Sequence, residues 1–286
     1  MAKIKTWRER MSEDMRLSDF SSRTREGYLA AATQFVKWLD RDPETATDDD
    51  VRDYFLYLRD DKQLAPSSIH VILYALQFLL QRTMRRDLPV FKLLRVNKPR
   101  LLPVVLSPAE VRSVITVVRE PVRRMALATI YALGLRLNEG LSLETGHIDA
   151  ERLTVWVRNG KGAKDRGVPL PRPLLARLRR YWKTERPVST TPYLFVVGGG
   201  KAPLHDSTLQ KTFTAARADA GLTKQASIHT LRHSYATHLL EAGISLRTIQ
   251  HVLGHRSLRT TEIYMHVTQP GLERLQETVD RLMVDL

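Results

Sequence analysis

Six of the nine histidines in this 286-residue chain are concentrated near its carboxyl end. They are His229, His233, His238, His251, His255 and His266. The first two, and again the fourth and fifth, are four residues apart, a spacing that puts two imidazoles on one helix face, as in a zinc site. However, Thr230 and Val252 stand where a hydrolytic zinc helix has its glutamate, and the chain has no cysteine. We therefore rank a metal site second and expect neither a metal nor a cofactor.

A guanidinium, imidazoles and a tyrosine indicate phosphodiester chemistry instead. Arg232 follows His229 by three residues, so the two share a face if this stretch is helical. Arginine holds two phosphate oxygens in its planar fork, and histidine gives or takes a proton near neutral pH. His255 comes directly after Gly254, and Tyr264 lies nine residues further on. A tyrosine hydroxyl attacks phosphorus when neighbouring cations activate it. Each residue alone is more typical of a core position or a cap, so only the joint set favours chemistry.

Four segments together resemble the tyrosine recombinase (phage integrase) family. The string HTLRHSYATH begins at His229, and LGH begins at Leu253 and is followed by Tyr264. The string GLRLNE from Gly134 resembles the first arginine motif of the family. The string GKGAKDR from Gly160 resembles its β-hairpin motif, in which the first lysine is catalytic. The resemblance spans roughly residues 107 to 267.

This resemblance implies six active-site residues. They are Arg136, Lys161, His229, Arg232, His255 and Tyr264. Lys164 and Arg166 compete with Lys161 for the role of the acid, and we expect both to contact DNA phosphates. We expect His233 to be structural or to support a neighbouring group, and Glu139 to orient its neighbours rather than to act as a base.

Two positions depart from the family pattern. Asn138 stands where serine or glycine is usual, and Gly140 replaces a typical aliphatic residue. Neither change removes a catalytic group, but both bear on how Arg136 is seated. The chain starts almost directly with the module that resembles the core-DNA-binding domain. It therefore resembles Xer-like, integron-like or transposon-borne members more than integrases with an additional arm-site domain.

The resemblance also implies a mechanism. Tyr264 attacks the scissile phosphate of duplex DNA, forms a 3′-phosphotyrosyl bond and releases a 5′-hydroxyl. The two arginines and His255 stabilise the charge on the phosphorane, Lys161 protonates the leaving oxygen, and His229 helps to accept the tyrosine proton. Because the covalent bond conserves the energy of the phosphodiester, the 5′-hydroxyl of a second strand rejoins it through a Holliday junction, without ATP or metal.

Two other functions remain compatible with these features. A catalytically silent DNA-binding regulator on the same scaffold would bind DNA without forming an adduct. A topoisomerase of related tyrosine chemistry would relax supercoils without sequence preference, whereas a recombinase needs paired sites. All six catalytic identities are present, which a silent protein need not retain.

The charge of the chain favours a nucleic-acid partner. Lysine and arginine number 45 against 31 acidic residues, a net charge of +14. Residues 1–100 contribute 19 − 15 = +4, and the remainder contributes 26 − 16 = +10. Outside the hairpin motif, we expect DNA contacts from Arg95, Lys98 and Arg100. No stretch approaches about 20 consecutive apolar residues, so we expect no membrane partner and a cytoplasmic protein of a bacterium or mobile element.

The elements that must position these residues fall into two domains. Residues 1–86 have apolar residues at helical spacing and predict a small helical bundle, which resembles the core-DNA-binding module. Residues 87–106 are basic and interrupted by prolines, which predicts an extended linker, with an ordinary surface loop as the alternative. Residues 107–286 form the catalytic domain. The fold class is mainly α with a small antiparallel β-sheet, and the resemblance implies that the two domains form a clamp around DNA.

Local signals divide the catalytic domain into elements. Ser107 and Glu110 form a capping box at the start of a helix, and Gly134 is typical of a helix end. Val155 and Val157 alternate with polar and aromatic residues, which predicts a strand that returns over residues 167–170. Further helices are expected over residues 172–183 and 206–220.

The carboxyl end carries an apolar stripe at helical spacing over residues 272–286. Its members are Leu272, Leu275, Val279, Leu282 and Leu286. Such a helix packs either on its own domain or, as the resemblance implies, on the neighbouring protomer of a homotetramer assembled on double-stranded recombination sites. We favour the second arrangement because the resemblance implies it. Only a short segment separates Tyr264 from this helix, so docking would be able to move the nucleophile into or out of position. Whether an accessory protein or a second recombinase takes part is left open.

Overall fold

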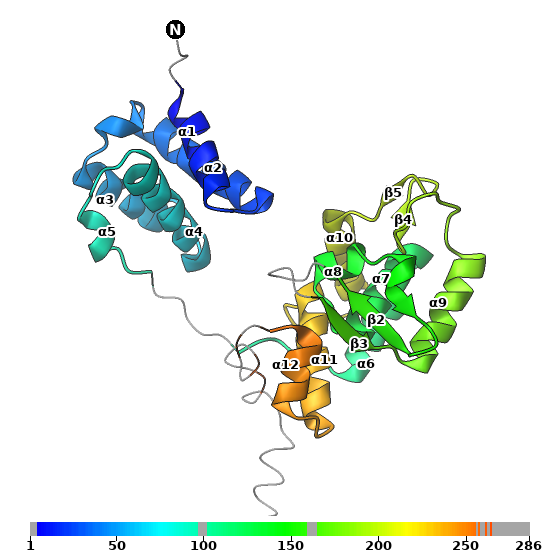
Figure 1. The fold of residues 1–286 in the computed structure, drawn as a ribbon. Helices are drawn as coiled ribbons and strands as arrows, with labels where there is room; N and C mark the ends of the chain where they lie inside the picture. Colours follow the sequence, from blue (N-terminus) through cyan, green and yellow to red (C-terminus); the bar gives the residue numbers. More distant parts are fainter. Residues whose placement is uncertain are drawn as a thin grey trace, which may run out of the picture. The chain divides into compact units, whose positions relative to one another are not determined.

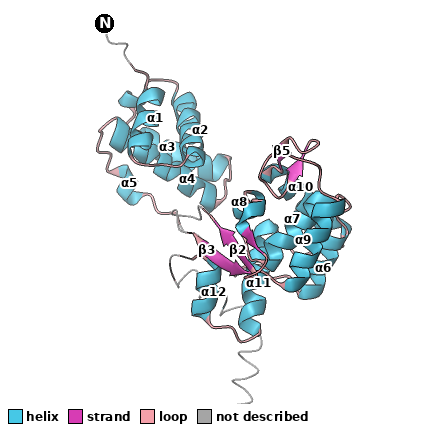
Figure 2. Ribbon diagram, turned by 45° about the vertical axis from the view of Figure 1, so that its right-hand side comes forward, coloured by secondary structure: helices cyan, strands magenta, loops and turns pink. Residues whose placement is uncertain are grey.

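The computed structural model describes residues 5–96, 102–158, 165–255, 257, 261 and 264. The chain divides into two compact units, Met1–Arg100 and Leu101–Leu286 (Figure 1). Most elements are helices, with short antiparallel strands in the second unit, which confirms the expected fold class (Figure 2). Among the described residues, no helix combines the length and the apolar character that a membrane crossing requires.

The first unit is a helical bundle. Its helices are α1 (Trp7–Leu17), α2 (Ser22–Leu39), α3 (Asp48–Leu56), α4 (Pro66–Gln77) and α5 (Val90–Leu93), with π-helical turns at Tyr57–Asp61 and Phe78–Thr83 and a 3-10 turn at Pro43–Thr45. The acidic first turn of α3 is closed by a capping box between Thr47 and Asp50. Helices α2 and α4 pack against each other, and Phe35, Leu73 and Leu76 are buried in the core that they share.

The segment expected to be an extended linker is folded at its beginning. Leu88, Val90 and Phe91 are buried in the core of the first unit, and α5 forms within the segment. The Val90 N–H donates to Asp48 Oδ1 at 2.8 Å, which ties this turn to α3. Apolar burial at these three positions therefore outweighs the basic charge and the prolines that favoured an extended chain. At the far end of the segment, Leu106 is fully buried in the second unit.

The second unit surrounds helix α7 (Pro121–Ala132), which packs against the helices on either side of it in sequence and against later ones. The other helices are α6 (Pro108–Thr116), α8 (Leu137–Leu141), α9 (Arg172–Thr184), α10 (Asp206–Asp219), α11 (Ile228–Glu241) and α12 (Leu246–Leu253), with a 3-10 turn at Thr145–His147. The Ser107–Glu110 capping box is present at the start of α6. Gly134, just beyond α7, is left-handed, with φ +59°.

A three-stranded antiparallel sheet lies beside these helices (Figure 2). Its strands are β1 (Ile148–Asp149), β2 (Thr154–Val157) and β3 (Arg166–Pro169), and a separate pair is formed by β4 (Val196–Val197) and β5 (Ala202–Pro203). Val155 of β2 lies opposite Val168 of β3, and both are fully buried. The period-two alternation seen in the sequence therefore marks the inward face of the sheet.

Candidate active site

Helix α11 presents the histidine and arginine motif to the interior of the second unit. The helix packs against α7 and α12. Its buried polar residues are Thr230, Arg232, Ser234 and Thr237. The Ser234 hydroxyl accepts from the Leu106 N–H at 2.9 Å and donates to the Thr230 carbonyl at 2.8 Å. Polar side chains on a buried helix need such partners, so the position of α11 is specified by hydrogen bonds as well as by apolar packing.

Arg232 is held by the carboxyl ends of two helices. Its side chain is only 1% exposed, and its terminal nitrogens donate to the Gly134 carbonyl at 2.8 Å and the Leu253 carbonyl at 2.6 Å. A Cβ atom on Gly134 would come within 2.4 Å of the Tyr235 ring, so the close approach of α7 and α11 requires glycine there. Burial, and secondarily the nearby Arg136, lowers the pKa of Arg232 to about 10, so the guanidinium stays charged at neutral pH.

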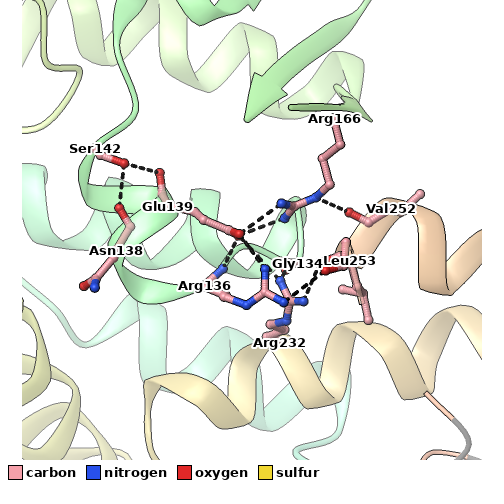
Figure 3. Close-up of polar contacts among 10 residues, drawn as sticks. Gly134, Arg136, Asn138, Glu139, Ser142, Arg166, Arg232, Val252 and Leu253 are labelled. Carbon is pink, nitrogen blue, oxygen red and sulfur yellow. Dashed lines mark hydrogen bonds and ion pairs between the residues drawn. The ribbon is translucent and has the colours of Figure 1, made fainter. Parts of the chain in front are cut away.

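Arg136 lies at the start of α8 and is the more exposed of the two arginines, with 25% of its side chain accessible. Its guanidinium donates to Glu139 Oε1 at 2.7 Å and to the Gly254 carbonyl at 3.2 Å. Arg136 and Arg232 thus meet at the end of α12. Figure 3 shows the two side chains close together, Arg136 coming from the start of α8 and Arg232 from α11.

Glu139 is the carboxylate on which the arginines converge, and it is nearly buried. Arg166 donates to both of its oxygens, at 2.9 and 2.8 Å, and Arg232 Nη1 lies 3.6 Å from Oε2 (Figure 3). Burial alone would raise the pKa of Glu139, but the hydrogen bonds from Arg166 and Arg136 outweigh it and lower the pKa to about 2. We call Arg136, Arg166 and Arg232 with Glu139 the guanidinium cluster.

Arg166 does not lie where a phosphate contact would place it. Its side chain is 6% exposed, and besides Glu139 it bonds the Val252 carbonyl at 2.7 Å through Nε. The reason is the packing of β3 against α12, which turns the first residue of β3 inward. Lys161, Lys164, Lys98 and Arg100 lie outside the described residues, whereas Arg95 is exposed at the end of the first unit.

Tyr264 is covered by its surroundings. The side chain is 1% exposed and packs with Ala236, Ile249 and Leu253. Its hydroxyl lies 3.0 Å from His233 Nδ1. Burial raises the pKa of the Tyr264 phenol, and the charges of Arg232 and Arg136 oppose this only in part. In this arrangement the phenol is protonated at neutral pH.

Three imidazoles surround the Tyr264 phenol and its neighbours. His255 stacks on the phenol, with ring centroids 6.3 Å apart and an interplanar angle of 20°, and its Nδ1 lies 2.9 Å from Thr261 Oγ1. His229 contacts His233 edge to face, with centroids 4.6 Å apart. Burial, aided by neighbouring charges such as that of Arg232, lowers the pKa of all three, to about 3 for His255 and about 4 for His233. All three are therefore neutral at pH 7.

Of the positions considered in the sequence, Arg166 is buried where an exposed phosphate contact was expected, and His233 lies in a supporting position. His233 is one helical turn beyond His229, and that spacing was the available signal for its contact with the Tyr264 hydroxyl.

The structure also describes the two positions that depart from the family motif. Asn138 is exposed and its side chain points away from the guanidinium cluster (Figure 3). A Cβ atom on Gly140 would lie 2.5 Å from Ile130, so glycine lets α8 pack closely on α7.

Comparison with protein families gives matches to most of the chain. Residues 105–270 match the phage integrase family, and residues 7–90 match the phage integrase N-terminal SAM-like domain. The integrase/recombinase homologue y4qK of Sinorhizobium fredii is 40% identical over 261 residues, which cover 91% of this chain and 84% of that protein. An integrase/recombinase of Escherichia coli is 31% identical and covers 96% and 93% of the two chains.

Solved structures share the fold. The XerH site-specific recombinase bound to its palindromic difH substrate superposes with a TM-score of 0.71 at 21% identity, over 89% of this chain and 78% of that one. A lambda integrase tetramer bound to a Holliday junction gives a TM-score of 0.74 at 18% identity, over 90% and 76%. At these identities the likeness concerns the fold alone.

Proposed function

Because this chain belongs to the phage integrase family of tyrosine recombinases, and is a site-specific DNA recombinase that breaks and rejoins strands, we propose that Tyr264 is its nucleophile. One observation carries this assignment. The phenol lies against His233 and His255, and the charges of Arg232 and Arg136 act on its hydroxyl. The two arginine charges lower the pKa of the phenol against the effect of burial, and nearby cations of this kind activate a tyrosine for attack on phosphorus.

In the proposed reaction, the Tyr264 oxygen forms a bond to the scissile phosphorus and the 5′-oxygen leaves. The product is a 3′-phosphotyrosyl bond and a free 5′-hydroxyl, with Lys161 as the donor of the proton to the leaving oxygen. Attack by the 5′-hydroxyl of a second strand then reverses the step, and strands are exchanged. The phosphodiester count is unchanged, so neither ATP nor hydrolysis is required.

The phosphate is proposed to bind at Arg136 and Arg232. Both are charged guanidiniums fixed by helix carbonyls, so their donors need little reorganisation when charge develops on the phosphorane. With Nδ1 of His255 occupied by Thr261, its Nε2 is the nitrogen left to donate to a non-bridging oxygen. Duplex DNA cannot reach either the Tyr264 phenol or the Arg232 side chain while each is 1% exposed, so we propose that DNA binding draws Tyr264 out of its packing and uncovers Arg232.

The tyrosine proton is assigned to His229, a neutral imidazole that is able to accept it. His233 holds the hydroxyl before attack, as its 3.0 Å contact supports. The release of this contact would be part of activation. This division of roles separates a residue that keeps the nucleophile covered from one that takes its proton.

The partners are proposed to be two double-stranded recombination sites held by a homotetramer. The solved relatives include a recombinase on its DNA substrate and a tetramer on a Holliday junction. The SAM-like first unit and the second unit would clamp the duplex, with Arg95, Lys98 and Arg100 contributing contacts. Residues 272–286 lie outside the described residues, and their docking on a neighbouring protomer stays a prediction.

The test is to trap the covalent intermediate. Sites are selected from random duplexes by binding, and the selected sequence is made as a nicked suicide substrate without divalent metal. We expect the wild-type protein to form an adduct that survives denaturation. Tyr264→Phe should bind the same DNA and form none, while the matched variant Tyr193→Phe, in the loop before β4, should form it normally.

Three other outcomes would overturn the assignment. Tight binding without any adduct from the wild-type protein would indicate a DNA-binding regulator. An adduct on unrelated sequences, accompanied by relaxation of supercoils, would indicate a topoisomerase. An adduct from Tyr264→Phe would place the nucleophile on another residue.

A further inference from the structure

Arg166 is the most completely bonded member of the guanidinium cluster. All three of its side-chain nitrogens donate: two to the Glu139 carboxylate, at 2.9 and 2.8 Å, and Nε to the Val252 carbonyl, at 2.7 Å. The side chain is 6% exposed, and Figure 3 shows its contacts with Glu139 and Val252. A guanidinium with this geometry is oriented by its protein partners, and its fork faces a carboxylate rather than solvent.

The carboxyl end of α12 receives one arginine on each of three successive carbonyls. Val252 accepts from Arg166, Leu253 accepts from Arg232, and Gly254 accepts from Arg136. The last carbonyls of a helix lack partners within the helix, and the negative end of the helix dipole favours cations there. One helix end therefore fixes the relative positions of all three guanidiniums, although they come from β3, α11 and the start of α8.

Glu139 closes the same arrangement from the other side. It bonds Arg166 through both oxygens and Arg136 through Oε1, while Arg232 stays at 3.6 Å. Without the fork of Arg166, the buried carboxylate would lack its strongest partner and would draw Arg136 and Arg232 toward itself. The two guanidiniums assigned to the phosphate would then move.

Gly254 adds a steric link between Arg166 and the nucleophile segment. Its φ is +64°, and a Cβ atom there would lie 3.0 Å from Arg166 Cδ and 3.1 Å from Nη1. The turn after α12 thus packs directly on the Arg166 side chain. His255 follows in the chain, so Arg166 also sets where the segment leading to Tyr264 departs.

We propose that Arg166 is a positioning residue of the recombination reaction: through Glu139 and the end of α12, its buried guanidinium sets the positions of Arg136 and Arg232, and it makes no contact with DNA. The proposal rests on the proposed function of Tyr264 and assigns a new residue to it. It replaces the phosphate contact expected at this position from the sequence.

The test measures single-turnover adduct formation on the nicked suicide duplex, DNA affinity by mobility shift, and melting temperature. We expect Arg166→Gln to slow adduct formation by about 10²-fold, the order of loss for a displaced reacting group, while the Kd for DNA changes by less than about threefold. Arg166→Lys should be similarly slow, because one ammonium cannot replace the fork. Arg152→Gln, on an 83% exposed arginine at the β1–β2 turn of the same sheet, is the matched control and should behave as wild type.

A double variant distinguishes positioning from loss of folding. Glu139→Gln with Arg166→Gln removes one charge of each sign, so the net charge of the guanidinium cluster is unchanged, and Arg136 and Arg232 keep their bonds to helix carbonyls. We expect it to fold and to be no slower than the slower single variant, because both act through the same cluster. If Arg166→Gln does not fold, Arg166→Lys and the double variant decide, and both must fold and remain slow for the proposal to stand.

Three results overturn the proposal. One is an adduct rate equal to wild type in Arg166→Gln or Arg166→Lys. Another is a rate loss that disappears at saturating DNA together with a weakened Kd, which would make Arg166 a phosphate contact. The third is a double variant whose loss of rate, expressed as activation free energy, equals the sum of the losses in Glu139→Gln and Arg166→Gln. Absence of the adduct from wild-type protein contradicts the proposed function itself, and so is distinguishable from these outcomes.

Discussion

At the scale of single residues, the site is organised by the burial of charge. Glu139 stays ionised in a nearly closed environment because Arg166 and Arg136 bond it. Arg232 stays charged although its side chain is 1% exposed, since two helix carbonyls and the nearby carboxylate compensate the lost water. Conversely, burial dominates at the imidazoles and at the Tyr264 phenol, which are therefore neutral.

Replacing Arg232 by lysine tests the requirement for a planar donor. Lysine keeps the charge but cannot donate to the Gly134 and Leu253 carbonyls while presenting a fork to phosphate. We expect the single-turnover rate of adduct formation to fall on the order of 10²–10³-fold. The control is Arg217→Lys. Arg217 lies in α10, and its guanidinium donates to Gln225 in the loop that follows this helix. A rate within threefold of wild type for Arg232→Lys would contradict the assigned role.

The lowered pKa of His255 predicts how stability depends on pH. Burial, with help from Arg232 and Arg136, lowers this pKa from 6.5 in the unfolded chain to about 3 in the folded one. The unfolded chain therefore takes up a proton first, so the stabilising contribution is present above pH 6.5 and is lost as the pH falls toward 3. At pH 5 the loss from this histidine amounts to up to about 2 kcal/mol.

Urea unfolding at pH 7 and pH 5 measures this contribution. The free energy of unfolding should fall between the two values in the wild-type protein, and it should fall less in His255→Gln. The carboxylate of Glu139 does not contribute in this range, because its pKa lies at about 2 when folded and 4.5 when unfolded. An equal loss in both proteins would show that His255 is not shifted.

At the scale of elements, two helix ends hold the arginines that we propose to bind the phosphate. Gly134 ends α7 and Gly254 ends α12, both with positive φ, and their carbonyls accept from Arg232 and Arg136. Glycine at a helix end supplies the left-handed turn that exposes the last carbonyls to a cation. The two glycine turns therefore both end the helices and orient the arginines.

Gly134→Ala tests the role of this close approach. The new Cβ atom would sit 2.4 Å from the Tyr235 ring in addition to occupying a left-handed φ. Gly221→Ala is the matched control, because its φ is +67° and nothing lies within 4 Å. We expect about 1–2 kcal/mol of destabilisation from the control, the cost of the conformation, and more from Gly134→Ala.

Adduct formation separates the two glycine variants further. Gly134→Ala should slow the single-turnover rate, because the carbonyl that holds Arg232 moves with the displaced helices. Gly221→Ala should leave the rate unchanged. Equal destabilisation and equal rates for both variants would contradict the packing argument.

At the scale of the whole molecule, the chain consists of two units and has a net charge of +14. Neutralising phosphates releases the counterions of DNA, so non-covalent binding must weaken with salt. We expect the Kd for the selected site to rise by at least about tenfold between 50 and 200 mM salt. The adduct, once formed, should resist the same salt, because it is a covalent bond. A salt-independent Kd would contradict binding through phosphate contacts.

The sequence alone named the candidate reactive groups, because the motifs of the family restrict residue type and order. Arg136, His229, Arg232, His255 and Tyr264 could be named from motifs, and the structure describes all of them in one unit. Helix ends were also predictable, because Gly134 and the Ser107–Glu110 capping box act through local backbone chemistry. Lys161 lies outside the described residues and stays a prediction.

What only the tertiary structure decided is which polar groups are buried against which. Arg166 is a residue type that commonly contacts phosphate at a protein surface. The packing of β3 on α12 nevertheless turns its side chain inward to Glu139 and Val252. His233 was expected to play a supporting part, and the tertiary structure identified its partner as the Tyr264 hydroxyl, 31 residues away. The inward turn of residues 88–91 likewise came from long-range burial. Charge and periodicity are local properties of a chain, whereas burial depends on partners that are distant in sequence.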